Sequence, residues 1–272
     1  MSHANISREP KAALVGTRGG RPTGNPGRLD QALVERGLAA SRELGKRAIL
    51  AGRVRVNGQQ ARKASDAVRA ADRIEMAGPE RFVSRGGYKL EHGLAHFGVE
   101  VAGATAIDLG ASTGGFTDCL LQRGAARVCA VDVGHGQLAW KLRRDARVVV
   151  MEKTNARHLR PAGFPAGVVP AELVVIDCSF ISLRKILPPA VALLRPSGRI
   201  VALVKPQFEA GKAEADKGAG VIRDPAIHER VLRQLAEFVA GLGGLTWRGV
   251  TESPVLGPAG NKEFLVLLEK TG

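Results

Sequence analysis

The sequence has few cysteines and no long apolar run, and each shortage excludes a class of protein. Its 272 residues include three cysteines, Cys119, Cys129 and Cys178. Their spacing fits neither a disulfide framework nor a metal site, and all three lie in or beside apolar segments. We therefore interpret them as buried, reduced thiols of a cytoplasmic protein.

Membrane, targeting and metal-binding signals are also missing. No stretch approaches the roughly 18–20 uninterrupted apolar residues that a membrane helix needs. The basic residues near the N-terminus are not followed by the apolar run of a secretory signal. Of six histidines, only His92 and His96 stand at a ligand spacing, and no third ligand accompanies them. We therefore expect neither a membrane partner nor a metal site.

Acidic residues are too few to balance the basic ones. The chain has 40 lysines and arginines against 26 aspartates and glutamates, which gives a net charge of +14. Residues 1–92 hold 18 of the basic and 9 of the acidic residues, so nine of the fourteen excess charges lie in this part. A concentrated positive charge favours a polyanionic partner, because each neutralised phosphate releases a counterion. We therefore expect the chain to bind nucleic acid.

The N-terminal part divides into a leader and the start of a small domain. Residues 1–27 are rich in glycine and proline and lack apolar periodicity, so we expect a disordered basic leader. From Arg28 the apolar residues recur at helical spacing until Gly37, which predicts a first short helix. Ser41 is the expected N-cap of a second helix that ends at Gly52.

Two short strands complete this expected domain, which spans residues 28–78. The first strand, over 54–56, runs into Asn57-Gly58, a strong signal for a tight turn, and the second lies around 73–76. The segment resembles the alpha-L RNA-binding motif of a small-subunit ribosomal protein, tyrosyl-tRNA synthetases and many pseudouridine synthases. The basic side chains that we expect to contact RNA are Arg28, Arg42, Lys46, Arg53 and Arg55.

A larger domain is expected over residues 87–272, after a linker over 79–86. Its apolar runs are mostly continuous, as is typical of strands buried on both faces, and helical segments separate the first five. A long helix near 225–242 precedes two final strands, which we expect to pair antiparallel. This order predicts a doubly wound, mostly parallel seven-stranded α/β sheet. The expected strands are 105–109, 127–132, 147–151, 173–177, 199–205, 245–251 and 263–269.

The first strand of this sheet leads into a glycine-rich tract that ends at Gly115. In such sheets ligands bind at the carboxyl ends of the strands, and glycines let the backbone approach them. The second strand ends in Asp132, about 20 residues past the glycines, where a carboxylate can accept hydrogen bonds from ribose hydroxyls. Ser112 stands where a nicotinamide-binding loop has its second glycine, which disfavours a pyrophosphate and favours S-adenosylmethionine.

Asn155, just after the third strand, is placed to reach the adenine of that cofactor, although an ordinary turn asparagine is an equal alternative. The residues that we expect to bind the cofactor are Asp108, Gly110, Ser112, Gly114, Gly115, Asp132 and Asn155.

Charged residues follow two neighbouring buried strands. Asp177 and Lys205 end the fourth and fifth strands, where charged side chains are poor candidates for the core. Together with Lys89 before the sheet and Glu263 at the start of the last strand, they can converge on one cleft.

Five motifs occur in order along the chain: SRGGYKL, DLGASTGGFTD, DCSFISL, VKPQFE and GNKEF. In these motifs the chain resembles the TlyA family of ribosomal RNA 2′-O-methyltransferases, historically called haemolysins, and the resemblance spans residues 28–269. It implies a class I methyltransferase sheet, S-adenosylmethionine as the methyl donor, and ribosomal RNA or ribosomal subunits as the partner, with cytidine as the target. The family's linker motif usually contains tryptophan, whereas this chain has Arg81-Phe82-Val83-Ser84.

The resemblance also implies a catalytic tetrad, which falls on Lys89, Asp177, Lys205 and Glu263. A ribose 2′-hydroxyl is a poor nucleophile and must lose its proton as it attacks, and a lysine that has given up its own proton can accept it. By analogy with the family, Lys205 is the base and Lys89 orients the hydroxyl or stabilises negative charge. Asp177 and Glu263 then hold the two lysines.

Three other functions compete with this interpretation. A pseudouridine synthase shares the N-terminal domain type but needs no nucleotide cofactor, which leaves the glycine-rich loop unexplained. A membrane-active haemolysin lacks support in a chain without an apolar span. A non-catalytic RNA-binding or ribosome-assembly factor does not need the four charged residues, all of which are present.

Overall fold

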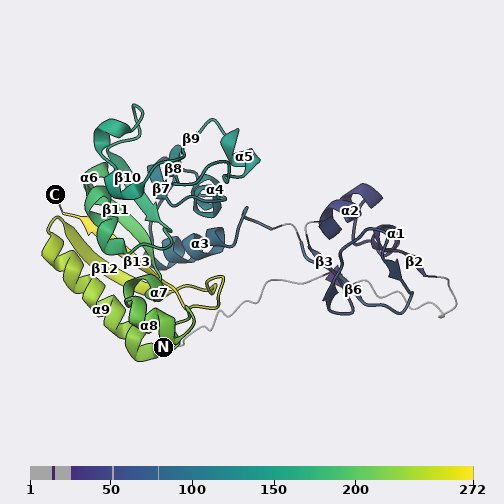
Figure 1. Cartoon of the computed structure of the whole chain (residues 1–272). Coiled ribbons are helices and arrows are strands. Elements are labelled where there is room, and N and C mark those ends of the chain that lie inside the picture. The colour runs from purple at the N-terminus through teal and green to yellow at the C-terminus, as the bar shows by residue number, and fades with distance from the viewer. Residues whose placement is uncertain (1–13, 16–25, 51, 79, 272) are drawn as a thin grey trace, which may run out of the picture. The chain divides into compact units, whose positions relative to one another are not determined.

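The computed structural model describes residues 14–15, 26–50, 52–78 and 80–271. The chain forms two compact units, Met1–Arg81 and Phe82–Gly272. Figure 1 shows the first in purple and blue and the second in teal, green and yellow. Most of the expected leader, residues 1–13 and 16–25, lies outside the described residues. Within it, however, Leu14–Val15 form a strand, β1, that pairs antiparallel with residues 75–76.

The first unit packs two helices against short strands. Its sheet has the order β1-β6-β3-β4, and a second pair joins β2 to β5. Large apolar side chains that are almost fully buried, such as Leu33 and Ile49, form its core. The elements are β2 (Gly27–Arg28), α1 (Leu29–Glu35), α2 (Arg42–Leu50), β3 (Val54–Val56), β4 (Gln59–Gln60), β5 (Ala67–Val68) and β6 (Ile74–Met76).

Local signals of the sequence decide where these elements begin and turn. The Ser41 hydroxyl accepts a hydrogen bond from the backbone N–H of Leu44 at 3.3 Å, so the predicted N-cap of α2 is confirmed. Asn57 and Gly58 both have positive φ, 51° and 79°, as the two-residue turn between β3 and β4 requires. The predicted hairpin is therefore confirmed as well.

A buried carboxylate ties α1 to α2. Asp30 is only 4% exposed, and its oxygens accept hydrogen bonds from Arg28 and Arg42, each at 3.0 Å. The Arg28 guanidinium in particular lowers the pKa of Asp30 to about 2. Two of the five arginines and lysines expected to contact RNA are therefore also structural partners of Asp30.

The second unit is built on the seven-stranded sheet that the sequence predicts. The strand order is β12-β13-β11-β10-β7-β8-β9. The five strands β11, β10, β7, β8 and β9 are parallel, and β13 is antiparallel to both β11 and β12. The strands are β7 (Thr105–Leu109), β8 (Arg127–Val131), β9 (Val148–Met151), β10 (Ala171–Ile176), β11 (Leu194–Val204), β12 (Leu245–Glu252) and β13 (Phe264–Lys270).

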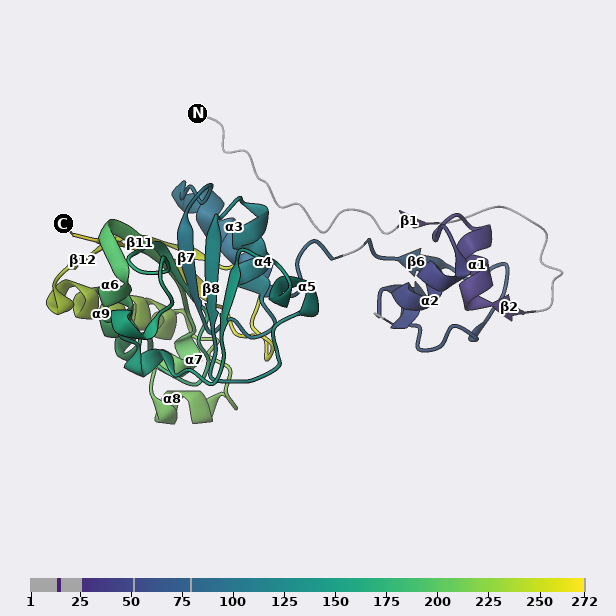
Figure 2. The ribbon, with the colours of Figure 1, turned by 90° about the horizontal axis from the view of Figure 1, so that it is seen from above.

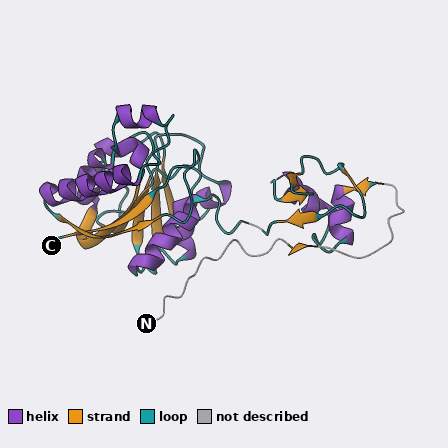
Figure 3. Ribbon diagram, turned by 90° about the horizontal axis from the view of Figure 1, so that it is seen from below, coloured by secondary structure: helices purple, strands orange, loops and turns teal. Residues whose placement is uncertain are grey.

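Helices cover both faces of this sheet. Figure 2 shows α3, α4 and α5 on one side of the strands and α6 and α9 on the other, and Figure 3 shows the sheet between these layers. The α-helices are α3 (Gly86–Phe97), α4 (Gly115–Gln122), α5 (Trp140–Arg143), α6 (Leu187–Leu193), α7 (Pro206–Glu209), α8 (Lys212–Lys217) and α9 (Pro225–Leu242), and the short 3-10 turns are η1 (Ala156–His158), η2 (Pro161–Gly163) and η3 (Leu183–Lys185).

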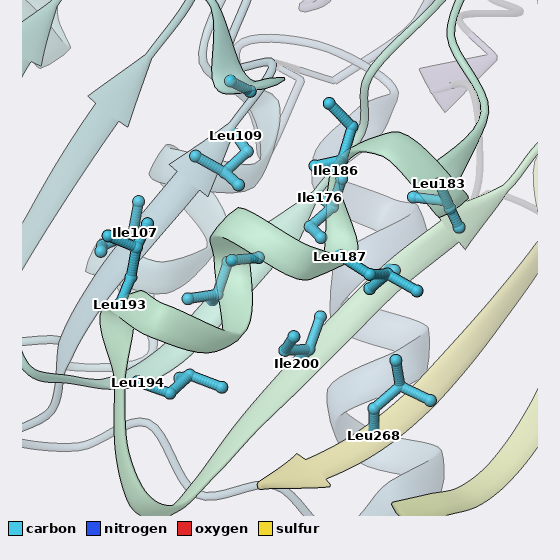
Figure 4. Close-up of a cluster of buried hydrophobic side chains, with 14 of the residues drawn as sticks. Ile107, Leu109, Ile176, Leu183, Ile186, Leu187, Leu193, Leu194, Ile200 and Leu268 are labelled. Carbon is cyan, nitrogen blue, oxygen red and sulfur yellow. The ribbon is translucent and has the colours of Figure 1, made fainter. Parts of the chain in front are cut away.

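Successive side chains of a strand point to opposite faces of the sheet, so the core has two clusters. The first lies on the face that α6 covers, and the second lies on the face that α3 and α4 cover. Ile107 and Leu109 of β7 point to the α6 face, whereas Ala106 belongs to the α3 and α4 face. Figure 4 shows Leu187 and Leu193 of α6 among the strand side chains of the first cluster, which include Ile107. Both faces of the central strands are thus buried, which explains their continuous apolar sequence.

The second unit begins inside the segment expected as a linker. Phe82 is 2% exposed and packs with the α3–α4 cluster, edge-on to Tyr88 at a centroid distance of 5.0 Å. A Cβ on Gly87 would lie 2.2 Å from the Phe82 ring, so glycine is needed there to seat the aromatic side chain. The boundary lies between Arg81 and Phe82, several residues before the expected position 87.

We predict that Asp30→Asn will loosen the first unit in a pH-dependent way. The aspartate has a pKa lowered to about 2, so its stabilisation is present above the ordinary pKa of 3.8 and is lost as the pH falls toward 2. Amide hydrogen exchange of α1 and α2 in the full chain should be faster in the variant at pH 6. That difference should disappear near pH 2. An equal difference at both pH values would contradict this role of the carboxylate.

Candidate active site

The carboxyl ends of three neighbouring strands meet the start of α3 at one cavity. Its volume is about 260 Å³. Asp177 follows β10, Lys205 follows β11, and the loop after β7 supplies backbone to the wall. The lining residues are Ser84, Arg85, Gly86, Lys89, Gly110, Ala111, Ser112, Thr113, Gly115, Phe116, Asp177, Ser179, Lys205, Pro258 and Glu263. All four members of the expected tetrad are among them.

The tetrad forms two lysine–carboxylate pairs. The Lys89 ammonium lies 2.5 Å from the Glu263 carboxylate, and these residues are 7% and 1% exposed. The Lys205 ammonium lies 2.6 Å from Asp177, with Lys205 8% exposed. Charges this deeply buried are stable only when paired, because each has lost most of its hydration.

Parallel register brings the second pair together. In β10 and β11, Ile176 is opposite Ala202, so the residues that follow the two strands lie at the same edge of the sheet. The Lys205 ammonium also donates a hydrogen bond to the Ser179 hydroxyl at 2.8 Å. Lys205 is therefore held by two groups from the segment after β10.

Left-handed backbone shapes the loop between β7 and α4. Gly110 has a φ of 88°, and a Cβ there would stand 2.8 Å from the carbonyl oxygen of Asp177. Only glycine therefore lets this loop pack directly against the segment that follows β10. Ser112 also has positive φ, 49°, which a non-glycine residue adopts at a cost.

Asp132 supports this strained serine. One carboxylate oxygen accepts a hydrogen bond from the backbone N–H of Ser112 at 2.8 Å, and the other accepts one from Gly134 at 2.7 Å. The carboxylate thus links the loop after β7 to the segment after β8. Each oxygen has a further lone pair for a ligand hydroxyl.

A second cavity of about 500 Å³ adjoins the first, and Gly110, Ser112, Asp177 and Ser179 line both. Asp132 and Asn155 line the second cavity, together with apolar side chains such as Val133 and Ile181. An acidic group for ribose hydroxyls and an apolar wall for a purine fit S-adenosylmethionine. The shared residues connect this second cavity with the one that the tetrad lines.

Not every residue expected at the cofactor lines a cavity. Asp108 is completely buried within β7, where its carboxylate accepts a hydrogen bond from the Thr117 hydroxyl of α4 at 2.7 Å. Burial raises the pKa of Asp108 to about 7, and the nearby Asp177 and Asp132 add to the rise. Gly114, with a φ of 96°, is packed under Leu142, to which a Cβ would come within 2.2 Å. Asp108 and Gly114 therefore support the loop through contacts with α4 and α5 and line neither cavity.

Asn155 has a local role in addition to its position at the second cavity. Its side-chain oxygen accepts a hydrogen bond from the backbone N–H of Arg157 at 3.0 Å and so caps η1. Asn155 therefore lies where a cofactor residue was expected and also acts as an ordinary turn asparagine, the two alternatives that the sequence left open.

Three polar residues of the site were not singled out from the sequence. They are Ser179, Ser182 and Glu209. The Glu209 carboxylate accepts hydrogen bonds from the Ser182 hydroxyl and the Leu183 backbone N–H, each at 2.7 Å. Glu209 therefore joins the helix after Lys205 to the loop after Asp177. Burial raises the pKa of this carboxyl group. All three residues stand inside the motifs DCSFISL and VKPQFE, so the motifs contained the signal but spacing alone did not assign a partner.

The first unit places the expected RNA-contacting residues on its surface in two groups. Arg28 and Arg42 are held by Asp30. Lys46 and Arg55 are exposed and Arg53 is half-exposed, and in the described part of the chain none of these three has a salt-bridge partner. The second group is therefore free to meet phosphates without first giving up an ion pair.

Two further features bear on the function. Among the described residues, no three His, Cys, Asp or Glu side chains are grouped so that they could hold a metal ion. His92, whose Nε2 lies 3.1 Å from the Thr251 hydroxyl, has a pKa lowered mainly by burial.

No helix within the described ranges combines the length and the apolar character needed to cross a membrane.

The fold and the cavity fit a methyltransferase, and comparison with known proteins shows that this chain belongs to that class. Residues 82–270 match the family model of FtsJ-like methyltransferases, and residues 27–74 match the S4 domain. The chain is 50% identical over 246 residues to the candidate rRNA methyltransferase YqxC of Bacillus subtilis, covering 90% of this chain and 86% of that protein.

Two further relatives narrow the group. The chain is 46% identical over 245 residues to the 16S/23S rRNA (cytidine-2′-O)-methyltransferase TlyA of Mycobacterium tuberculosis, covering 89% of each. A solved structure of a candidate hemolysin from Streptococcus thermophilus superposes with a TM-score of 0.69 at 44% identity, covering 91% of this chain and 89% of that one. The chain belongs to the TlyA family of FtsJ-like methyltransferases, as its motifs predicted, and its cofactor is S-adenosylmethionine.

We predict that Asp132→Ala will weaken S-adenosylmethionine binding. The change removes the acceptor for ribose hydroxyls and also frees the backbone N–H groups of Ser112 and Gly134. Hydrogen bonds to a charged group are worth about 1.5–3 kcal/mol, and calorimetric affinity should fall by that amount. Asp132→Asn, which keeps one acceptor oxygen, should lose less. Wild-type affinity in the alanine variant would contradict the assignment.

Proposed function

We propose that this chain transfers the methyl group of S-adenosylmethionine to ribose 2′-hydroxyls of cytidines in ribosomal RNA of both subunits, in the cytoplasm. The observation that carries the proposal is the presence of two buried lysines, each paired with a carboxylate, at one cavity beside the glycine-rich loop. The names of its relatives support the substrate, because TlyA of Mycobacterium tuberculosis is a 16S/23S rRNA cytidine-2′-O-methyltransferase. The S4 domain supports RNA as the partner.

Lys205 is the base in this proposal. When bound, S-adenosylmethionine supplies an electrophilic methyl group on a positively charged sulfur. Asp177 at 2.6 Å and the Ser179 hydroxyl at 2.8 Å fix the direction of the Lys205 amino group. The neutral amine then accepts the proton of the 2′-hydroxyl as that oxygen becomes a nucleophile.

Lys89 keeps its charge in this scheme. Glu263 is almost completely buried and holds the Lys89 ammonium at 2.5 Å. A fixed cation at the wall of the cavity stabilises negative charge that develops on the ribose oxygen. The two lysines thus have different tasks, although each has one carboxylate partner.

RNA binding starts from the first unit. Of the five residues expected to contact RNA, Lys46, Arg53 and Arg55 carry no salt bridge within the described part of the chain, so they lose the least on contact with phosphates. Phosphate contacts position an RNA without reading its sequence, which leaves the choice of nucleotide to the cavity of the second unit. Mapping ribose methylation in ribosomal RNA with and without this chain tests the whole proposal.

We predict that Lys205→Ala will abolish methyl transfer while cofactor binding persists. Loss of a general base typically lowers the rate about 100- to 10,000-fold. Lys205→Arg should fail almost as badly, because a guanidinium does not release its proton near neutral pH. Single-turnover methylation of ribosomal subunits measures both variants, and Lys217→Arg, at an exposed lysine of α8, is the matched control. A Lys205→Arg enzyme with full activity would show that Lys205 acts only as a cation.

A second prediction concerns the RNA surface of the first unit. Replacing Lys46, Arg53 and Arg55 by glutamine should weaken binding to ribosomal subunits and flatten its salt dependence, by roughly 0.9 in slope for each lost phosphate contact. S-adenosylmethionine affinity should be unchanged. The control is Arg248→Gln, which removes an exposed arginine of β12 paired with Glu269. An unchanged salt slope in the triple variant would mean that RNA contacts another surface.

A further inference from the structure

An exposed tryptophan stands beside the loop that carries the cofactor-binding glycines. Trp140, the first residue of α5, is 72% exposed. The backbone N–H of its neighbour Ala139 donates a hydrogen bond to the carbonyl oxygen of Thr113 at 3.1 Å, and Thr113 lines the catalytic cavity. Indole is among the largest apolar groups, so leaving it in water gives up burial that would stabilise the fold.

The segment under this indole is rigidly held. Leu138 and Leu142, on either side of Trp140, are 5% and 3% exposed and fill the space beside Gly114. The Lys141 ammonium pairs with Asp118 of α4 at 2.9 Å, and Arg143 pairs with Glu152 and donates to the Leu138 carbonyl. The backbone that carries the exposed ring is therefore held by its neighbours on both sides.

Its surroundings favour an anionic, aromatic partner. The Arg144 guanidinium lies over the ring, 5.9 Å from its centroid, and so covers part of one face while the residue stays largely exposed. Arg144 is exposed and has no salt bridge within the described part of the chain, and Lys141 is exposed but shares its charge with Asp118. An indole flanked by cations is the arrangement that stacks on a nucleobase while the charges meet phosphates.

We infer that Trp140 is a stacking platform for an unpaired base of the RNA substrate, next to the catalytic cavity. This inference rests on the proposed function, because RNA is the occupant. A base taken out of its helix loses stacking, and an aromatic surface near the cavity replaces part of it. Trp140 would thus hold a nucleotide of the opened RNA segment in place while the 2′-hydroxyl faces Lys205.

Intrinsic fluorescence of the full chain tests the inference directly. The chain has two tryptophans, so Trp247→Phe leaves Trp140 as the single indole reporter. Its emission should be open to acrylamide in the free protein and should be quenched by single-stranded oligocytidylate. A double-stranded RNA of equal charge should quench it much less. If acrylamide cannot reach the indole in the free protein, another part of the chain covers it and the inference is wrong.

Binding measurements give the second arm. Trp140→Ala should weaken oligocytidylate binding about 5- to 150-fold, the effect of losing one stacked base, and Trp140→Phe should keep most of the affinity. Cofactor affinity should be unchanged in both variants. The matched control is Val250→Ala, which removes another exposed apolar side chain, on β12. Wild-type affinity of Trp140→Ala would overturn the inference.

The two proposals can fail separately. If the wild-type chain methylates ribosomal subunits and Trp140→Ala does so with unchanged KM for RNA, only the stacking platform is refuted. If the wild-type chain methylates no ribosomal RNA but oligocytidylate still quenches Trp140, the proposed function is refuted and the stacking surface stands.

Discussion

Two lysines can be buried at one cavity only because each is paired with a carboxylate, and this constraint governs the architecture around the site. Removing one partner of a buried ion pair typically costs about 3–5 kcal/mol, so all four positions must be held together. Parallel pairing of β10 and β11 brings Asp177 beside Lys205, and α3 brings Lys89 beside Glu263 at the start of β13. The order of strands in the sheet is thus a condition for the charge arrangement.

The loop after β7 couples this charge cluster to the cofactor site. Gly110 lets the loop touch the Asp177 backbone, while Ser112 depends on the Asp132 carboxylate for its support. The buried Asp108 of β7 fixes the start of α4 through its hydrogen bond with the Thr117 hydroxyl. The short loop after β7 therefore contacts residues at the ends of two other strands, β8 and β10, and it forms part of the wall of both cavities.

Most of the fold followed from local patterns in the sequence. Apolar runs, most of them continuous because both faces of a doubly wound sheet are covered, predicted the seven strands, and the helix over 225–242 was predicted with its observed bounds. The start of the second unit was harder to predict from the sequence. Phe82 stands outside any periodic element, and its burial depends on the space above Gly87, which no local pattern encodes. The strand at Leu14–Val15 was missed for a similar reason, since its partner is 60 residues away.

For the site, the sequence by itself determined the residue types and their places at strand ends, since motifs such as VKPQFE and GNKEF are local. It determined the family and the cofactor in the same way. Only the tertiary structure decided which lysine pairs with which carboxylate, that Glu209 contacts Ser182 and Leu183 while Ser179 contacts Lys205, and that Trp140 stays exposed. These properties depend on contacts between residues far apart in the chain and on the few ångströms that separate an ion pair from two solvated charges.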